Sequence, residues 1–484
     1  MSVPFYNLLY NLEVDPGAEE PLYLQVAGRV AEVIHSGRLQ PGAPMPGTRT
    51  LAKALGIGRN AAIAAYGELH DQGWIITEVG FGTRVALTLP DYRGTAWRDP
   101  GRSGRISTCG FDLEAAWAEA PAATLQARVD LRDPEPDPRL FPEDDLARAL
   151  RRAVALSFGR TRRPPDPAGP AEVRAALAEF LAERRALPAD SGALLLTAGS
   201  QDGLGLAVRH LFPPGSVVAV EDPGNPRAWA ALNLAGAQPI PVPVDAEGIR
   251  PEALEDVCIA QRPRALYLTP NLQWPTGAVL SPERRAAVLE LAGRYRMAVL
   301  EDDHAAELYF EERDWRPLAA EDRRAVVLHF GGFERLLGPA FALGYVCGPK
   351  QALAALVRAR AEEGGGDLDL AAWALRDLLL DGILLRHIRK ARTAYRSRRD
   401  LALETLGSLP GLRVRCPASG LALWIEGEDL EAWRRGAEAV GLALRPASHW
   451  ALGPDAAPGL LFPFARLEEA ELKDVLELLR RVRK

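Results

Sequence analysis

Apolar positions recur at helical spacing in three short stretches near the start of the chain. In residues 22–35 they fall three and four apart and end before Gly37, which predicts a helix with a C-terminal glycine. A second helix is predicted over 48–55, with Thr48 as its N-cap, and a third over 59–71. These three elements predict a small helical domain.

Two short runs that follow these helices have a strand-like composition. Residues 74–77 and 83–87 are rich in β-branched and aromatic side chains, and they flank the turn sequence Gly80-Phe81-Gly82. They are therefore predicted to form a hairpin. Three helices followed by a hairpin wing is the layout of a winged helix-turn-helix.

Further along, short continuous apolar runs alternate with helical stretches. Continuous apolar strands are typical of a mainly parallel sheet that is covered on both faces. The runs that predict its strands are 193–196, 216–220, 265–268, 297–300 and 326–329. Towards the end, residues 386–399 predict a long helix with seven Arg and Lys residues and no acid, which favours a solvated interdomain helix.

These patterns divide the chain into five parts. Residues 1–20 are interpreted as an N-terminal arm, 21–89 as the winged helix-turn-helix and 90–127 as a Pro- and Gly-rich linker, with one short helix expected near its middle. Residues 128–385 are interpreted as a large α/β domain. Residues 386–484 are interpreted as a small α+β domain that alternates helices and strands.

Composition narrows the class of protein. With 484 residues the chain is long enough for several domains. No stretch is apolar enough to span a membrane, so a cytoplasmic location is expected. The four cysteines lack the spacing of a metal site or disulfide framework, so no metal is expected. The net charge of −6 does not favour nucleic acid, but residues 34–66 contain no acid and four Arg or Lys residues.

The helical domain resembles the DNA-binding domain of GntR-type regulators. The segments that carry the resemblance are L-Y-x-Q at 22–25, S-G-R-L-x-P-G at 36–42, P-x-x-R-x-L-A at 46–52, G-I-G-R-N at 56–60 and G-F-G-T-R-V at 80–85. The resemblance implies binding to double-stranded operator DNA. Because a recognition helix enters the major groove N-terminus first, the candidate DNA contacts are Thr48, Arg49, Arg59, Asn60, Gly82 and Arg84.

From residue 21 to the C-terminus the chain resembles the MocR family, in which a GntR domain is fused to a fold-type-I, aspartate aminotransferase-like body. The matching segments include 131–142, the glycine-rich 198–203, 220–224, 267–277 and 299–303. The resemblance implies an α/β body with a mainly parallel sheet domain and a small C-terminal α+β domain. It also implies a homodimer and a pocket for pyridoxal phosphate.

Residues 331–345 resemble the family segment G-T-F-S-K-T-L-x-P-G-L-R-L-G-Y, which holds the cofactor. Arg335 stands where the family has the Schiff-base lysine, Glu334 where it has a phosphate-binding serine and Ala342 where it has an arginine. A guanidinium with a pKa above about 12 cannot supply the free amine of an imine. The same resemblance places Asn225 and His304 at positions of two further cofactor contacts, an aromatic ring and a tyrosine.

Three other pocket positions keep the family's residue types, namely Ser200, Gln201 and Asp302. We therefore expect a degenerate pocket with no cofactor, no catalytic residue and no enzyme activity. Two alternatives remain open. A lysine outside the motif could bind pyridoxal phosphate. Arg335, Arg227 and His304 could instead bind a small anionic effector. If they do not, we expect Arg335 to fill the pocket and to pair with Glu334 or Asp302.

Overall fold

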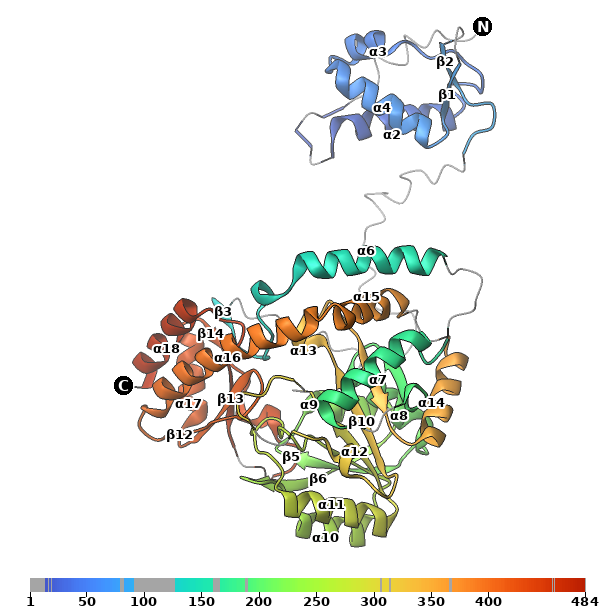
Figure 1. The fold of residues 1–484 in the computed structure, drawn as a ribbon. Helices are drawn as coiled ribbons and strands as arrows, with labels where there is room; N and C mark the ends of the chain where they lie inside the picture. Colours follow the sequence, from blue (N-terminus) through green and yellow to red (C-terminus); the bar gives the residue numbers. More distant parts are fainter. Residues whose placement is uncertain are drawn as a thin grey trace. The chain divides into compact units, whose positions relative to one another are not determined.

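The computed structural model describes residues 14–483 except 16, 19, 79–81, 91–126, 160–165, 188–189, 305–306, 313–314, 365–367, 455 and 457 (Figure 1). The chain divides into two compact units, residues 1–122 and 123–484. Most of the expected arm and linker, and the helix expected in the linker, lie outside the described residues. No described helix is both long and apolar enough to cross a bilayer.

The first unit consists of three helices and a hairpin. The helices α2 (Leu22–His35), α3 (Thr48–Leu55) and α4 (Arg59–Asp71) have the predicted bounds, and β1 (Ile75–Glu78) pairs antiparallel with β2 (Gly82–Val85). Their apolar faces form one core in which Val30, Leu51 and Leu69 are fully buried. The apolar faces of the three helices meet in this core, so each helix needs to bury only one face to stabilise a domain of this size.

The prediction that Thr48 caps α3 was wrong. Gly47 is the N-cap, with extended backbone angles of φ −64° and ψ 153°, and Thr48 is the first helical residue. An N-cap residue must leave helical geometry for its side chain to reach the next amides, and here glycine takes that conformation. No side-chain cap hydrogen bond forms at α3. The hydroxyl of Thr48 is thus not used in capping.

The second unit contains one large sheet, two small ones and their covering helices. The elements up to the middle of the unit are β3 (Val129–Asp130), η2 (Pro138–Leu140), α6 (Glu143–Gly159), α7 (Ala171–Arg185), η3 (Ser191–Ala193), β4 (Leu194–Thr197), α8 (Ser200–Leu211), β5 (Val217–Asp222), α9 (Pro226–Leu234), β6 (Gln238–Asp245), β7 (Gly248–Ile249), α10 (Pro251–Gln261), β8 (Ala265–Leu268), α11 (Pro282–Tyr295) and β9 (Ala298–Asp302).

The remaining elements complete the large sheet and form the C-terminal part. They are α12 (Leu318–Glu321), β10 (Val327–Gly332), α13 (Glu334–Leu337), β11 (Gly344–Cys347), α14 (Lys350–Glu362), α15 (Asp369–Leu380), α16 (Ile383–Gly407), β12 (Leu412–Arg415), β13 (Ala422–Gly427), α17 (Leu430–Ala439), β14 (Leu442–Ala443), η4 (Ala447–Trp450), β15 (Leu460–Pro463) and α18 (Glu469–Arg483).

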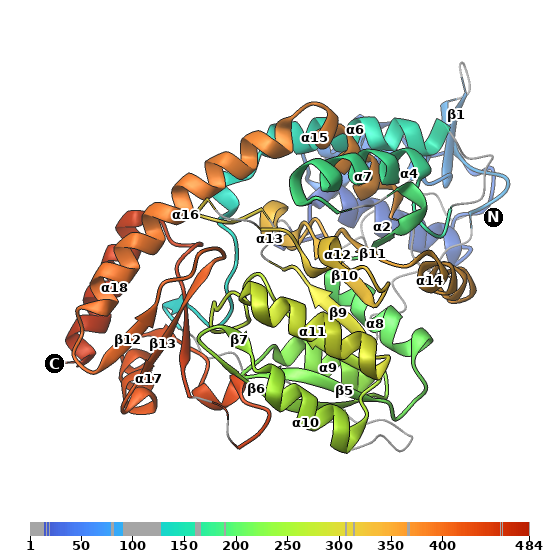
Figure 2. The same cartoon turned by 60° about the horizontal axis from the view of Figure 1, so that its bottom comes forward.

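The large sheet has eight strands in the order β4-β11-β10-β9-β8-β5-β6-β7. The neighbours from β10 through β6 pair in parallel, whereas β11 and β7 are antiparallel to their neighbours. Alternate residues of β5 face opposite cores. Val218 and Val220 pack against α8 and α9, and Ala219 packs on the side of α10 and α11, which lie side by side in Figure 2. This double burial explains the continuous apolar strands in the sequence.

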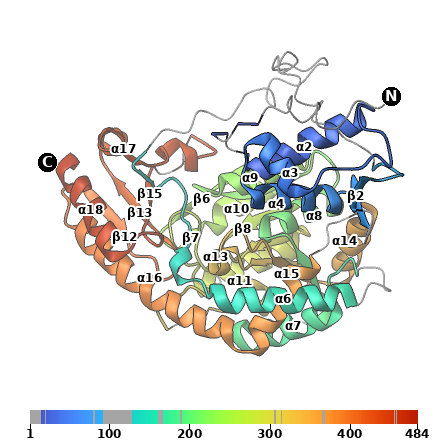
Figure 3. The ribbon, with the colours of Figure 1, turned by 90° about the horizontal axis from the view of Figure 1, so that it is seen from above.

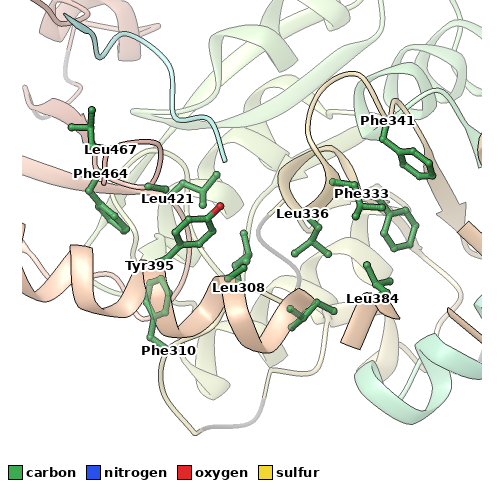
Figure 4. Packing of buried hydrophobic residues seen from close by; sticks show 14 of the residues in the cluster. Leu308, Phe310, Phe333, Leu336, Phe341, Leu384, Tyr395, Leu421, Phe464 and Leu467 are labelled. Atoms are coloured by element: carbon green, nitrogen blue, oxygen red, sulfur yellow. The ribbon is translucent and has the colours of Figure 1, made fainter. Parts of the chain in front are cut away.

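The helix α16 links the large sheet to the C-terminal strands. It runs along one edge of this unit from α15 towards α18 (Figure 3). Its Tyr395 projects into a core shared with Leu308 and Leu421, which come from two distant segments (Figure 4). The Tyr395 hydroxyl accepts a hydrogen bond of 3.0 Å from the backbone amide of Asp137.

The prediction that the basic stretch of α16 is solvated was wrong for three of its arginines. Arg398 is buried and forms an ion pair of 2.8 Å with Asp137, and Arg399 is buried with its guanidinium over Phe310. Arg392 lies over the Tyr309 ring and donates to the carbonyl of Glu307. Carbonyls and aromatic rings from neighbouring segments satisfy these cations, which local charge patterns do not reveal.

The core of the first unit can be tested by truncating one side chain. Leu69→Ala removes a fully buried side chain, so we expect the local free energy of unfolding of α2–α4 to fall by about 2–5 kcal/mol. Amide hydrogen exchange of the full chain measures this value. Leu87, which is 76% exposed, provides the control Leu87→Ala, for which a change within about 0.5 kcal/mol is expected. Equal losses in both variants would contradict the packing described.

Candidate functional sites

The first candidate site is the exposed end of the helix-turn-helix. Gly56 ends α3 in the left-handed region, with φ +65°, and α4 begins at Arg59. Arg49 on α3 and Arg59 and Asn60 in the first turn of α4 are all exposed, and Thr48 is partly exposed. Their guanidinium, amide and hydroxyl groups are thus available to a partner, as expected for a helix that enters a groove N-terminus first.

The two wing residues are held differently. Gly82 is exposed and has φ +79°, a conformation that glycine adopts without strain. Arg84 is half-buried, and its Nη1 donates a hydrogen bond of 3.3 Å to the carbonyl of Gly42. Part of the Arg84 donor capacity is therefore used within the unit.

The second candidate site is a cavity of about 440 Å³ at the carboxyl edge of the large sheet. The start of α8, the start of α9 and the ends of β9 and β10 meet there. In open α/β sheets this edge is the usual place for ligands. The cavity is lined by Asp133, Pro134, Glu135, Pro136, Ser200, Gln201, Asn225, Pro226, Arg227, Ala230, Trp274, Asp302, His304, Glu334, Arg335, Pro339, Arg445, His449 and Trp450.

Asp302 lies at the end of β9 and is only 3% exposed. Its Oδ2 accepts a hydrogen bond of 2.7 Å from the Tyr267 hydroxyl and a longer one of 3.4 Å from Gln201 Nε2. Burial raises the pKa of Asp302 to about 7; repulsion from Glu334 adds to this, whereas the Tyr267 hydrogen bond opposes it. The protonated form of this carboxyl group is therefore favoured more than in an exposed aspartate.

His304 is neutral in this setting. Burial, reinforced by repulsion from Arg335, lowers its pKa to about 3. The imidazole packs edge-on against Trp274, with 5.1 Å between the ring centres. Neither ring nitrogen has a hydrogen-bond partner among the described residues. His304 thus offers one donor and one acceptor.

Glu334 and Arg335 follow directly after β10 and take different positions. The Ser200 hydroxyl donates to Glu334 Oε1 at 3.4 Å, so the carboxylate lies beside the first residue of α8. A Cβ at Gly332 would come within 2.1 Å of Glu334 Oε2, and a Cβ at Gly199 would lie 3.6 Å from Oε1. Gly332 therefore gives this carboxylate the room it needs to lie there.

Arg335 contacts two other residues of the cavity lining, Pro134 and Trp274. Its Nη1 donates a hydrogen bond of 2.5 Å to the carbonyl of Pro134, and its guanidinium carbon lies 5.1 Å from the centre of the Trp274 ring. Burial lowers the pKa of the guanidinium from its ordinary value, while the charge of Glu334 opposes that shift. The expected direct pairing of Arg335 with Glu334 or Asp302 is replaced by these contacts, and Arg335 does not fill the cavity.

Of the eight expected pocket positions, seven line this cavity and one does not. The exposed Ala342 is not among its lining residues. Asn225 lines the cavity and also caps α9, because its Oδ1 accepts from the amide of Arg227 at 3.1 Å while its Nδ2 donates to the Tyr267 hydroxyl. Capping and this hydrogen bond give Asn225 a structural role beside any role in binding.

Sequence reasoning missed several residues of the cavity. Arg445 forms an ion pair of 2.9 Å with Asp133, whose carboxylate also lies 3.6 Å from Arg227, a residue that the sequence did indicate. Trp450 packs against Trp274 with 6.0 Å between ring centres. Asp133, Arg445 and Trp450 come from the two ends of the second unit, so no local motif could have connected them with β9.

Comparison with known families decides the class of this protein. The family "Bacterial regulatory proteins, gntR family" matches residues 22–85, and the family "Aminotransferase class I and II" matches residues 136–479. The chain belongs to the MocR-type transcriptional regulators of the GntR family. It therefore combines a GntR helix-turn-helix with an aminotransferase-like body, and the fold class expected from the sequence is confirmed.

Individual relatives agree with this assignment. The chain is 29% identical over 390 residues to a probable rhizopine catabolism regulatory protein, MocR, of Rhizobium meliloti, covering 81% of this chain and 78% of that protein. It is 31% identical to the regulator TauR of Rhodobacter capsulatus, covering 81% of each. Among solved structures, the α-aminoadipate aminotransferase LysN of Thermus thermophilus is 27% identical with a TM-score of 0.66, covering 73% of this chain and 91% of LysN.

The protonation of Asp302 gives a pH-dependent prediction. Its pKa rises from 3.8 to about 7 on folding, so its contribution to the free energy of unfolding is fully present below about pH 4 and is lost as pH rises towards 7. Asp302→Asn removes this ionisation. Relative to wild type, the variant's free energy of unfolding should therefore increase across that window by on the order of 1–4 kcal/mol.

Urea denaturation at several pH values measures this difference. The exposed Asp256 provides a matched control, because Asp256→Asn removes a carboxylate from the surface of α10. We expect the difference in free energy of unfolding between Asp256→Asn and wild type to stay constant with pH. If this difference is also constant with pH for Asp302→Asn, the carboxyl group of Asp302 is ionised normally.

Proposed function

We propose that this regulator binds operator DNA through Arg49, Arg59 and Asn60, and that its aminotransferase-like body has lost covalent pyridoxal phosphate chemistry. The body then serves as a dimerisation scaffold and as a sensor of a small effector. A cytoplasmic location follows from a role on DNA. Each part of this proposal rests on a different set of residues.

The pair Glu334 and Arg335 carries the proposal of a degenerate pocket. The residues present do not fit pyridoxal phosphate, because Arg335 has no free amine to form an imine. The carboxylate of Glu334, which stands where the resemblance gives a phosphate-binding serine, also lies beside Ser200 at the start of α8. Two anions at one helix start would repel each other, whereas a single one is stabilised there by the free amides.

Lysines elsewhere do not offer a substitute amine within the described part of the chain. Lys350 forms an ion pair of 2.7 Å with Asp190 and is largely exposed, and Lys390 lies within 3.4 Å of the carbonyl of Leu140. None of the described lysines lines the cavity. This distribution favours the degenerate pocket over a regulator or transaminase that uses a lysine outside the motif.

The helix-turn-helix supports DNA binding by its charge and its exposure. Residues 34–66 contain no acid, and the exposed Arg49 and Arg59 can contact guanine bidentately or clamp phosphates. Bodies of this class pair as two-fold dimers, so two helix-turn-helix units would bind two half-sites. Dimerisation would then raise the affinity of two individually modest contacts.

The DNA part is tested on Arg59. A duplex selected from a random pool by the full chain serves as the probe, and Arg59→Ala should weaken specific binding by about 1–3 kcal/mol if its guanidinium contacts a base. Fluorescence anisotropy at fixed salt measures the affinity. Arg29, exposed on α2 and paired with Glu32, gives the control Arg29→Ala, which should bind nearly as wild type. Unchanged binding by Arg59→Ala would refute the assignment.

The cofactor part is tested by trapping an imine. After incubation of the full chain with pyridoxal phosphate and reduction with borohydride, mass spectrometry should find no stoichiometric adduct on the wild-type chain. A double variant, Glu334→Ser with Arg335→Lys, supplies an amine and removes the carboxylate, so it serves as the positive control. An adduct on a lysine of the wild-type chain would establish the alternative function.

A further inference from the structure

One large apolar side chain lies on the outer face of the helix that begins with Arg59. Ile63 of α4 is 47% exposed, whereas Ala62, Ala65 and Leu69 of the same helix are fully buried in the core of the first unit. Isoleucine is also a weaker helix former than alanine. The internal packing of the unit therefore gives no reason for an isoleucine at this position.

Ile63 shares its face of α4 with the two polar residues of the first turn. Residues three and four apart on a helix are neighbours, so Asn60 and Arg59 lie on the N-terminal side of Ile63. All three residues are exposed. Helical side chains also lean towards the N-terminus, which brings the isoleucine closer to Arg59. A partner that contacts Arg59 and Asn60 would therefore also contact Ile63.

Gly67 continues this face one turn further along the helix. It is exposed, and a Cβ placed on it would meet no atom of the described residues within 4 Å. Glycine inside a helix lowers the stability of that helix, and here neither a positive φ nor a close internal neighbour requires it. The missing side chain leaves room beside Ile63 for a close approach from outside the unit.

The charge around this face favours a polyanion as the partner. Residues 34–66 contain no acid, and Arg49 of α3 is exposed as well. The phosphates of a DNA duplex complement these cations. A second copy of the same face would instead bring the like charges of two Arg59 side chains together.

In the major groove, an exposed isoleucine has one matching chemical group. Among the four bases only thymine presents a methyl group there, and apolar side chains contact it. The β-branched side chain of Ile63 is stiff at χ1, so little side-chain freedom is lost on contact. Four residues of helix span about 6 Å, and base pairs stack about 3.4 Å apart, so such a thymine would lie within about two base pairs of the Arg59 contact.

We propose that Ile63 determines sequence preference by packing against the C5 methyl group of a thymine in the operator. Arg59 contacts the neighbouring part of the same half-site, and Gly67 leaves space for the edge of the groove. This inference rests on the proposed DNA binding through α4 and adds one base-specific contact to it.

Deletion of single methyl groups from the DNA tests this proposal. In the duplex selected by the full chain, each thymine is replaced in turn by 2′-deoxyuridine, which lacks the methyl group and keeps the base pairing. At one thymine within about two base pairs of the Arg59 contact, the wild-type affinity should fall about fourfold, as expected for losing the burial of one methyl-sized group. Arg59→Ala locates that contact, because exchange of the contacted base pair no longer changes the affinity of this variant.

Matched protein variants show whether Ile63 is the residue that contacts this methyl group. Ile63→Ala should bind the thymine and deoxyuridine duplexes equally, because the apolar partner is gone, and Ile63→Val should keep most of the wild-type difference. Ile259→Ala removes an isoleucine of α10 that is 64% exposed, and it should keep the whole difference. Amide hydrogen exchange of α2–α4 should be the same in Ile63→Ala as in wild type, because Ile63 lies outside the core.

Three results would overturn the proposal. They are equal wild-type affinities for all deoxyuridine duplexes, an undiminished methyl effect in Ile63→Ala, and a selected half-site without thymine near the Arg59 contact. If the wild-type chain selects no duplex at all, the proposed DNA function fails together with this inference. If Arg59→Ala weakens binding and deoxyuridine has no effect, only the Ile63 contact is refuted.

Discussion

The contact between the Glu334 carboxylate and the start of α8 is the interaction on which our proposal of a degenerate pocket depends. A helix start attracts one anion, and in this chain the anion is a side chain of the protein itself. Gly332 is required for that arrangement, because a side chain there would collide with the carboxylate. Arg335 then lies over Trp274, and Oδ1 of Asp302 has no hydrogen-bond partner among the described residues.

The same architecture separates two tasks. The GntR unit exposes its cations on short helices, and the apolar faces of these helices are buried in the core of the unit. The larger unit has the same kind of doubly covered parallel sheet as its enzyme relatives, and packing on both faces fixes the positions of β9, β10 and α8. A sheet of this kind can lose its chemistry without losing its cavity, since the cavity is formed by strand ends and loops.

Local patterns in the sequence predicted the fold well and the site only in part. The bounds of α2, α3 and α4 follow from apolar spacing and glycine stops, and the continuous apolar run of β8 reports its burial on both faces. The capping role of Asn225 and the burial of Arg398 were missed, because each depends on partners that packing brings from elsewhere. Arg445 and Asp133 meet for the same reason, with more than half of the chain between them.

A crystal structure of the full chain grown with excess pyridoxal phosphate tests the central claim most directly. The account predicts that the Glu334 carboxylate stays beside Ser200, that Arg335 stays over Trp274 and that no phosphate density is present at the start of α8. Phosphate density at Ser200 with Glu334 displaced, or an imine to any lysine, would contradict it.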